Sequence, residues 1–306
     1  MGVTFYGSLS QHKRLIMASL IELAHGLPWL YLSLMFLFSL MIGSFLNVVI
    51  HRLPIMLERE WHAEYRSYFD SDAEPAHATP YNLMVPRSCC PHCDHPITAL
   101  ENIPLLSWLW LKGRCRECQA PISVRYPLVE LLTALLSVAV AATLAPGWGT
   151  LAALALTWVL IALTFIDLDK MLLPDQLTLP LLWGGLLFNL LGGFVPLGDA
   201  VIGAMAGYLV LWSLYWAFKL LTGKEGMGYG DFKLLAAIGA WLGWQALPIV
   251  LLLSSLIGAL IGLTLIALRR HHQANPIPFG PYLAIAGWIA LLWGDSITRW
   301  YLNTVL

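Results

Sequence analysis

Charged residues are scarce in this sequence. They make up 11% of the 306 residues, against 58% hydrophobic residues, whereas a water-soluble domain carries about 25% charged residues. The 17 Lys+Arg against 18 Asp+Glu give a net charge of -1, so the concentrated positive surface that nucleic-acid binding requires is missing. The composition therefore excludes a soluble domain, predicts membrane lipid as the surroundings, and predicts no nucleic-acid partner.

The sequence also lacks several motifs of other protein classes. There is no HExxH segment, which argues against a zinc metalloprotease with an open metal site. Neither GxGxxG nor Gly-Lys-Ser/Thr is present. A phosphate-binding loop is therefore a weak interpretation of the closely spaced Gly226, Gly228 and Gly230. No internal repeat of the kind expected in many transporters is evident. One candidate function for such a chain is a membrane transporter or channel with intramembrane acidic residues. It is kept as the alternative to the enzymatic function considered below.

The few charges are concentrated in one segment, residues 51–125, whose 75 residues carry 8 of the Lys+Arg and 9 of the Asp+Glu. Apolar runs near the roughly 20 residues that a membrane-spanning helix needs flank this segment. They predict eight spans, at residues 29–50, 126–145, 149–167, 176–195, 197–221, 231–246, 247–268 and 278–294. Only Gln245 and Pro248 separate the sixth span from the seventh, so seven spans and one re-entrant segment form the alternative.

Positive residues predict the orientation of these spans. Alternate loops and their flanks hold 14 of the 17 Lys+Arg, and positive residues stay in the cytoplasm. The segment 51–125 is therefore expected in the cytoplasm, with both termini on the opposite side. In residues 1–28, Lys13 and Arg14 precede a short apolar run that Glu22 interrupts. We expect an interfacial helix there rather than a signal peptide.

All five cysteines lie in the polar segment, and four of them form two pairs of equal spacing. Cys90 and Cys93 are separated from Cys115 and Cys118 by 21 residues. Two such hairpins can place four thiolates around a zinc ion, about 2.3 Å from it. Two disulfides are the competing interpretation, but thiols persist on the reducing side of the membrane. Because four thiolates leave no open position for water, the predicted zinc is structural.

Three further residues near the cysteine pairs need a separate interpretation. Cys89 stands beside Cys90, and the x2 spacing of the second pair favours Cys90 as the ligand. His92 and His95 could each replace a thiolate. With four cysteines available, we expect both histidines to be solvated turn residues.

Acidic residues at the ends of apolar spans form the second group of candidates. Asp167 and Asp169 lie near the end of the third span, and Asp231 opens the sixth. Ionisable residues at such positions are functional candidates by default. Of two carboxyl groups a few ångström apart, one keeps its proton and the other becomes a base. Such a pair can activate water and protonate a leaving amine, which is peptide hydrolysis.

Helix capping is the competing interpretation of these aspartates. We accept it for Asp175, which follows Pro174 and is expected to cap the fourth span. For Asp231 the preceding Gly226, Gly228 and Gly230 favour a different role, because a glycine backbone can approach a bound peptide closely.

These residues resemble those of the type IV prepilin peptidases, bifunctional leader peptidases and N-methyltransferases of type IV pili and type II secretion. The resemblance extends over almost the whole chain, and GxGD together with the double CxxC is highly specific. The matching segments are residues 43–54 (GSFLNVVIHRLP), both CxxC pairs, 125–130 (RYPLVE), 167–175, 228–233 (GYGDFK) and 276–281 (PIPFGP).

The resemblance implies a GxGD-type intramembrane aspartyl protease of the bacterial inner membrane. It implies cleavage of prepilins or pseudopilins after a Gly on the cytoplasmic side, then methylation of the new N-terminus with S-adenosylmethionine. The family's catalytic aspartates fall on Asp167 and Asp231, with Asp169 as a supporting carboxylate. Gly113 matches a family glycine linked to the methyltransferase, although a turn glycine of the zinc site is an equal interpretation. Association with pilus or secretion assembly machinery is also expected.

The predicted fold is thus an all-α polytopic membrane protein with a cytoplasmic zinc-binding loop domain. Its expected organisation is an N-terminal interfacial segment (1–28), a first transmembrane helix (29–50), a zinc-binding domain (51–125) and a seven-helix membrane peptidase core (126–306).

Overall fold

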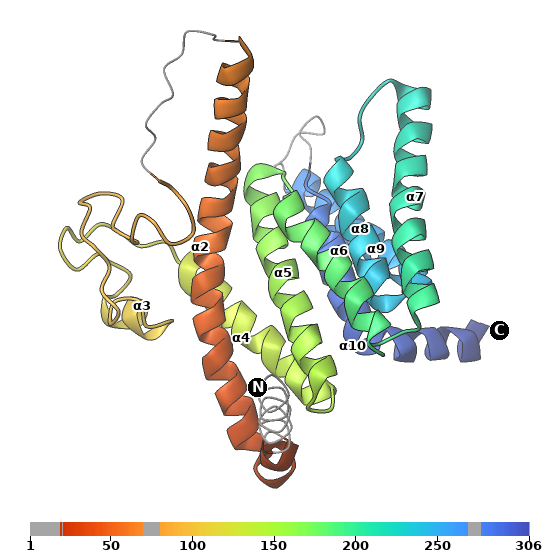
Figure 1. Cartoon of the computed structure of the whole chain (residues 1–306), viewed down its shortest axis with the longest axis horizontal. Helices are drawn as coiled ribbons and strands as arrows, with labels where there is room; N and C mark the ends of the chain where they lie inside the picture. The colour runs from red at the N-terminus through yellow and green to blue at the C-terminus, as the bar shows by residue number, and fades with distance from the viewer. Residues whose placement is uncertain (1–18, 20, 70–79, 269–276, 306) are drawn as a thin grey trace, which may run out of the picture. The chain divides into compact units, whose positions relative to one another are not determined.

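The computed structural model describes Ser19 and residues 21–69, 80–268 and 277–305, which form helices, turns and isolated β-bridges (Figure 1). The chain divides into two compact units, residues 1–158 and 159–306. The division falls within helix α5 (Trp148–Lys170). The predicted interfacial segment lies largely outside the described residues, although residues 21–26 are helical.

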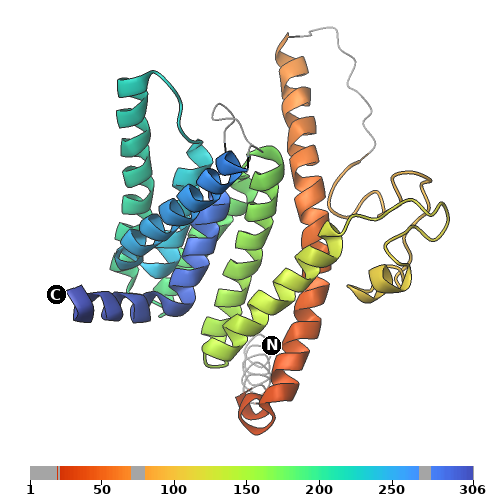
Figure 2. The ribbon, with the colours of Figure 1, turned by 180° about the vertical axis from the view of Figure 1, so that it is seen from behind.

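The first unit is built on three further helices, α2 (Pro28–Phe69), α3 (Leu106–Trp110) and α4 (Arg125–Thr143). The predicted first span lies within α2, but the helix does not end at Ile50. It continues through Pro54 to Phe69, so the polar segment begins as a helical extension of the span. The four cysteines and α3 follow in the connection from α2 to α4 (Figure 2).

Helices α2 and α4 pack against each other in antiparallel fashion. A Cβ atom on Gly43 would lie 2.7 Å from the Cα of Glu130, so only glycine permits this approach. One turn further along α2, the Asn47 side-chain amide donates a 3.0 Å hydrogen bond to the carbonyl of Tyr126. These two contacts fix the register of the helix pair, with Gly43 beside Glu130 and Asn47 beside Tyr126.

The second unit has α8 at its centre. Helix α8 packs against α6, α7, α9 and α10, and ten of its 14 residues are buried. Close approach to α7 depends on glycine, because a Cβ on Gly207 would lie 2.7 Å from the carbonyl oxygen of Leu235. The helices of this unit, after α5, are α6 (Asp175–Leu190), α7 (Leu197–Thr222), α8 (Tyr229–Leu242), α9 (Leu247–Ala267) and α10 (Gly280–Val305).

Each of the eight predicted spans coincides with a helix of the described chain, which confirms the all-α polytopic fold. Among the described residues, five stretches are long and apolar enough to cross a membrane: α2, α4, α5, α7 and residues Trp244–Leu265, which include most of α9. With 16 and 14 residues, α6 and α8 are shorter than the roughly 20 residues of a full span. The sixth and seventh predicted spans are separated at Gly243, whose φ of 79° ends α8.

Candidate active site and metal site

The four paired cysteines converge in the first unit. The Sγ atoms of Cys90 and Cys118 are 3.7 Å apart, those of Cys93 and Cys115 are 3.9 Å apart, and all four lie within 4.8 Å of one another. A tetrahedral zinc ion with bonds of about 2.3 Å requires sulfur atoms about 3.8 Å apart. All four are free thiols rather than disulfides. The donor type and spacing therefore fit a zinc ion held by four thiolates.

The two cysteine hairpins repeat the same backbone pattern, 25 residues apart. In the first, the N–H of Cys90 donates to the carbonyl of His95 and the N–H of Asp94 donates to Cys90, both at 2.9 Å. In the second, Cys115, Ala120 and Gln119 repeat these bonds at 2.9 and 3.1 Å. Asp94 and Gln119 both adopt positive φ, 54° and 58°. The sharp turn after each CxxC is thus a local property of the motif.

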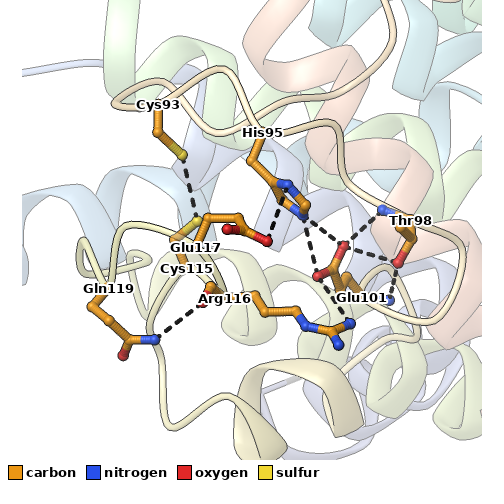
Figure 3. A network of polar contacts seen from close by, with 8 residues as sticks. All are labelled: Cys93, His95, Thr98, Glu101, Cys115, Arg116, Glu117 and Gln119. Atoms are coloured by element: carbon orange, nitrogen blue, oxygen red, sulfur yellow. Dashed lines mark hydrogen bonds and ion pairs between the residues drawn. The ribbon is translucent and has the colours of Figure 1, made fainter.

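His95 lies beside the cysteines but is engaged elsewhere (Figure 3). Its Nε2 is 3.3 Å from a carboxylate oxygen of Glu101, which also accepts hydrogen bonds of 2.9 Å from the N–H and the hydroxyl of Thr98. The Thr98 N–H holds the pKa of Glu101 below its usual range. Arg116 adds an ion pair to Glu101 at 3.9 Å. This network ties the two hairpins together around the cluster.

Cys89 and Gly113 occupy structural positions in the same module. Cys89 is exposed and outside the four-sulfur group, and its backbone pairs with Pro96 in a β-bridge. Gly113 has a φ of 68°, and a Cβ there would lie 2.9 Å from the ring of Trp108. The fold thus requires glycine at position 113 whether or not a cofactor binds nearby.

Asp167 and Asp231 both lie buried in the second unit, 5% and 6% exposed. Asp167 is in the last turn of α5, and its Oδ2 accepts a 3.0 Å hydrogen bond from the N–H of Gly280, the first residue of α10. Asp231 is in the first turn of α8, and its Oδ2 accepts a 3.3 Å hydrogen bond from the N–H of Gly228. Each carboxyl group thus accepts a hydrogen bond from a backbone N–H at a helix start. Such an N–H has no partner within its own helix, and negative charge is stabilised there.

Leu173 lies between the two aspartate-bearing segments. A Cβ on Gly230 would be 2.8 Å from Leu173 Cβ, and one on Gly280 would be 3.1 Å from a Leu173 methyl group. The two glycines therefore let the starts of α8 and α10 close around one leucine. This packing brings the segments that carry Asp167 and Asp231 together around Leu173. No local sequence signal marks Leu173 or the Gly280 N–H, although Gly280 lies in one of the matching segments.

Two of the three glycines before Asp231 have close packing neighbours. Positive φ occurs at none of Gly226, Gly228 and Gly230. Gly230 instead packs tightly on Leu173, and a Cβ on Gly226 would lie 3.0 Å from the Phe218 ring. Gly226 and Gly230 thus permit close packing around the start of α8.

Two further aspartates occupy positions outside the buried pair. Asp169 is exposed, because a separation of two residues in a helix turns it away from the face of Asp167. Asp175 is the first residue of α6, not its cap, and no side-chain cap bond is formed there. Its carboxylate instead binds Lys233 Nζ at 2.6 and 2.8 Å. The capping interpretation of Asp175 is therefore wrong, since this carboxylate links α6 to the first turn of α8.

Comparison with known proteins gives matches over both units. The model of the Bacterial Peptidase A24 N-terminal domain matches residues 37–144, and that of the Type IV leader peptidase family matches residues 154–263. A relative from Aeromonas hydrophila, named prepilin leader peptidase/N-methyltransferase, is 88% identical over 95% of this chain and 100% of its own.

Two more distant relatives carry the same name. Those from Pseudomonas aeruginosa and Stutzerimonas stutzeri are 58% and 56% identical, over 90% and 92% of this chain and 95% and 98% of their own. No solved structure matches the chain. The two family models and the extent of these identities establish that the chain belongs to the type IV leader peptidase family.

Proposed function

We propose that this protein removes the leader peptide of type IV prepilins or type II secretion pseudopilins and then methylates the new N-terminal amine. The observation that carries the peptidase activity is the pair Asp167 and Asp231, buried and each oriented by one backbone N–H. The names of relatives that match nearly the whole chain support both activities.

In the proposed hydrolysis, one carboxyl group of the pair is ionised and the other protonated, as close carboxyl groups favour. The ionised group takes a proton from water, whose oxygen forms a bond with the scissile carbonyl carbon. The protonated group supplies the proton that the departing amine needs when the C–N bond breaks. The N–H groups of Gly280 and Gly228 each hold one carboxyl oxygen, so the other oxygen is left to face water and peptide.

The zinc that the cysteine cluster fits has a structural role in this proposal. Cys90, Cys93, Cys115 and Cys118 would fill all four positions around the ion, which leaves none for water or substrate. S-adenosylmethionine, when bound, would supply the methyl group. Gly113 is the residue we propose as linked to the methyltransferase activity, and the Trp108 ring on its Cβ side gives the same glycine a packing role.

The proposed setting is the bacterial inner membrane, with the cysteine module and the aspartate pair facing the cytoplasm. Five membrane-length apolar stretches in the described part of the chain support a multi-pass protein. The cytoplasmic side is supported by the 14 of 17 Lys+Arg on alternate loops and their flanks. We place the protein next to the pilus or secretion assembly machinery, which receives processed pilins.

Purified full-length protein in detergent provides the test of the proposed function. It is incubated with one leader-bearing pilin and one pseudopilin, with and without S-adenosylmethionine, and the new N-termini are identified by mass spectrometry. We expect cleavage after Gly without added metal or nucleotide, and methylation only with the methyl donor. An intact leader on both substrates would contradict the peptidase assignment, and an unmodified amine would contradict the methyltransferase assignment.

The ion pair of Asp175 and Lys233 is expected to position the first turn of α8, and hence Asp231. Reversing either charge, in Asp175→Lys or Lys233→Asp, creates repulsion, whereas the double variant restores opposite charges. An exposed ion pair contributes up to about 1 kcal/mol to the stability of the structure that it holds. Loss of that free energy from the active arrangement of α8 corresponds to about a fivefold change, so we expect each single variant to cleave about fivefold more slowly. The double variant should recover most of the rate, with kcat rather than KM changing. Equal rates in single and double variants would contradict this role.

A further inference from the structure

Helix α3 presents an apolar surface to its surroundings. Residues 103–111 contain no charged residue, and Ser107 is their one hydroxyl-bearing side chain. Leu106, Leu109 and Trp110 are 64%, 63% and 87% exposed. Large apolar side chains gathered on one exposed surface mark a site of contact with another molecule or with lipid.

This surface is held in one orientation by the cysteine module. The Trp108 ring packs against Gly113, and its Nε1 donates a 3.2 Å hydrogen bond to the carbonyl of Ile122. Trp108 thereby attaches one side of α3 to the second cysteine hairpin. The opposite side, with Leu106, Leu109 and Trp110, is then directed away from the module.

The start of α3 lies at the level of the apolar part of α2. The N–H of Leu105 donates a 2.9 Å hydrogen bond to the carboxylate of Glu130 in α4, and Glu130 lies against Gly43 of α2. Gly43 precedes Ile50, the end of the apolar run, by seven residues, which corresponds to about 10 Å of helix. Figures 1 and 2 both show α3 at the height of α4, below the helical extension of α2 that follows the apolar run.

We infer that α3 is an interfacial helix whose Leu106, Leu109 and Trp110 side chains insert into the lipid leaflet beside the cysteine module. The bilayer is the occupant that the depth favours, because lipid already surrounds α2 and α4 at this level. Trp is enriched at membrane interfaces, and Lys112 and Arg114, both exposed, follow the helix where phosphate headgroups would lie. The module is thereby anchored to the membrane surface, independently of the reaction proposed above.

Photo-crosslinking from α3 tests this insertion. The photoreactive residue p-benzoylphenylalanine replaces Trp110 in the full-length protein, which is reconstituted in vesicles of phosphatidylethanolamine and phosphatidylglycerol. A second variant carries it in place of Leu106. The matched control replaces Trp61, a half-exposed tryptophan of α2 that follows Arg52 by nine residues and so lies about 13 Å further along the helix. Zinc content verifies that each module is folded.

We expect phospholipid adducts at positions 110 and 106 and none at position 61. Mass spectrometry of the illuminated protein provides the measurement. Adducts between position 110 and another protein segment, or the absence of lipid adducts at both α3 positions in zinc-containing protein, would overturn the inference. Equal lipid labelling at 61 and 110 would also overturn it, because the signal would then not report depth.

Discussion

Replacing Asp231 by Asn is expected to abolish leader-peptide cleavage. The amide has nearly the same size and its oxygen can still accept the Gly228 N–H, but it can neither take a proton from water nor supply one to the leaving amine. General acid–base catalysis contributes about 10²–10⁴-fold, so the rate should fall by at least that factor. Asp167→Asn should behave in the same way. The measurement is the initial rate of cleavage of a leader-bearing pilin in detergent.

The matched control for this experiment is Asp295→Asn, which makes the same chemical change at an exposed position of α10. It should cleave at the wild-type rate. Methylation of a pre-cleaved pilin should survive in Asp167→Asn and Asp231→Asn, provided that the two activities use separate sites. An aspartate variant that cleaves at the wild-type rate would refute the assignment of the dyad.

Gly280→Ala probes the geometry of the dyad while keeping both carboxyl groups. The added Cβ would lie 2.6 Å from Asp167 Oδ2 and 3.1 Å from Leu173, so the carboxyl group and the start of α10 must separate. We expect cleavage to fall with little change in methylation. Gly262→Ala, whose Cβ would have its nearest neighbour at 3.7 Å, is the matched control. Unchanged cleavage in Gly280→Ala would show that the Gly280 contact does not orient Asp167.

Cys93→Ser is expected to remove the bound zinc and to unfold the cysteine module. A hydroxyl is a poor replacement for a thiolate ligand, and structural zinc in small modules contributes about 10–16 kcal/mol of binding free energy, which is folding free energy. Zinc stoichiometry by elemental analysis and the rate of proteolysis within residues 80–125 provide the measurement. We expect loss of the metal and rapid cleavage of this segment.

Cys89→Ser is the corresponding control, because Cys89 is exposed and stands outside the four-sulfur group. It should retain both the metal and protease resistance. If Cys89→Ser lost the zinc while Cys90→Ser kept it, the ligand register would be the other one, with Cys89 in the site in place of Cys90.

The features predicted best from the sequence are those fixed by nearby residues. The two CxxC pairs are local, since each hairpin closes through bonds within a few residues of its own cysteines, such as Cys90 to His95. The apolar runs likewise determine where helices lie, because their length and hydropathy are properties of continuous segments. The family pattern pointed to Asp167 and Asp231, and the structure places both in one buried region.

The features that were missed depend on contacts between distant segments. Asp175 follows a proline as a capping residue would, yet its partner Lys233 is 58 residues away. The buried Glu130 receives the N–H of Leu105 from the cysteine module. Neither contact has a local sequence signal, because both depend on how the helices are packed.

By itself, the sequence determined a multi-pass helical protein with two cysteine pairs that suit a metal ion and a few acidic residues at helix ends, because charge, hydropathy and motif spacing are local properties. Only the tertiary structure decided what surrounds those residues. It gave Asp167 the Gly280 N–H from a helix start 113 residues away, and it turned the apolar side of α3 outward at the level of the membrane-spanning part of α2. Both outcomes result from helix packing, in which glycines set how closely backbones approach and so which distant groups meet.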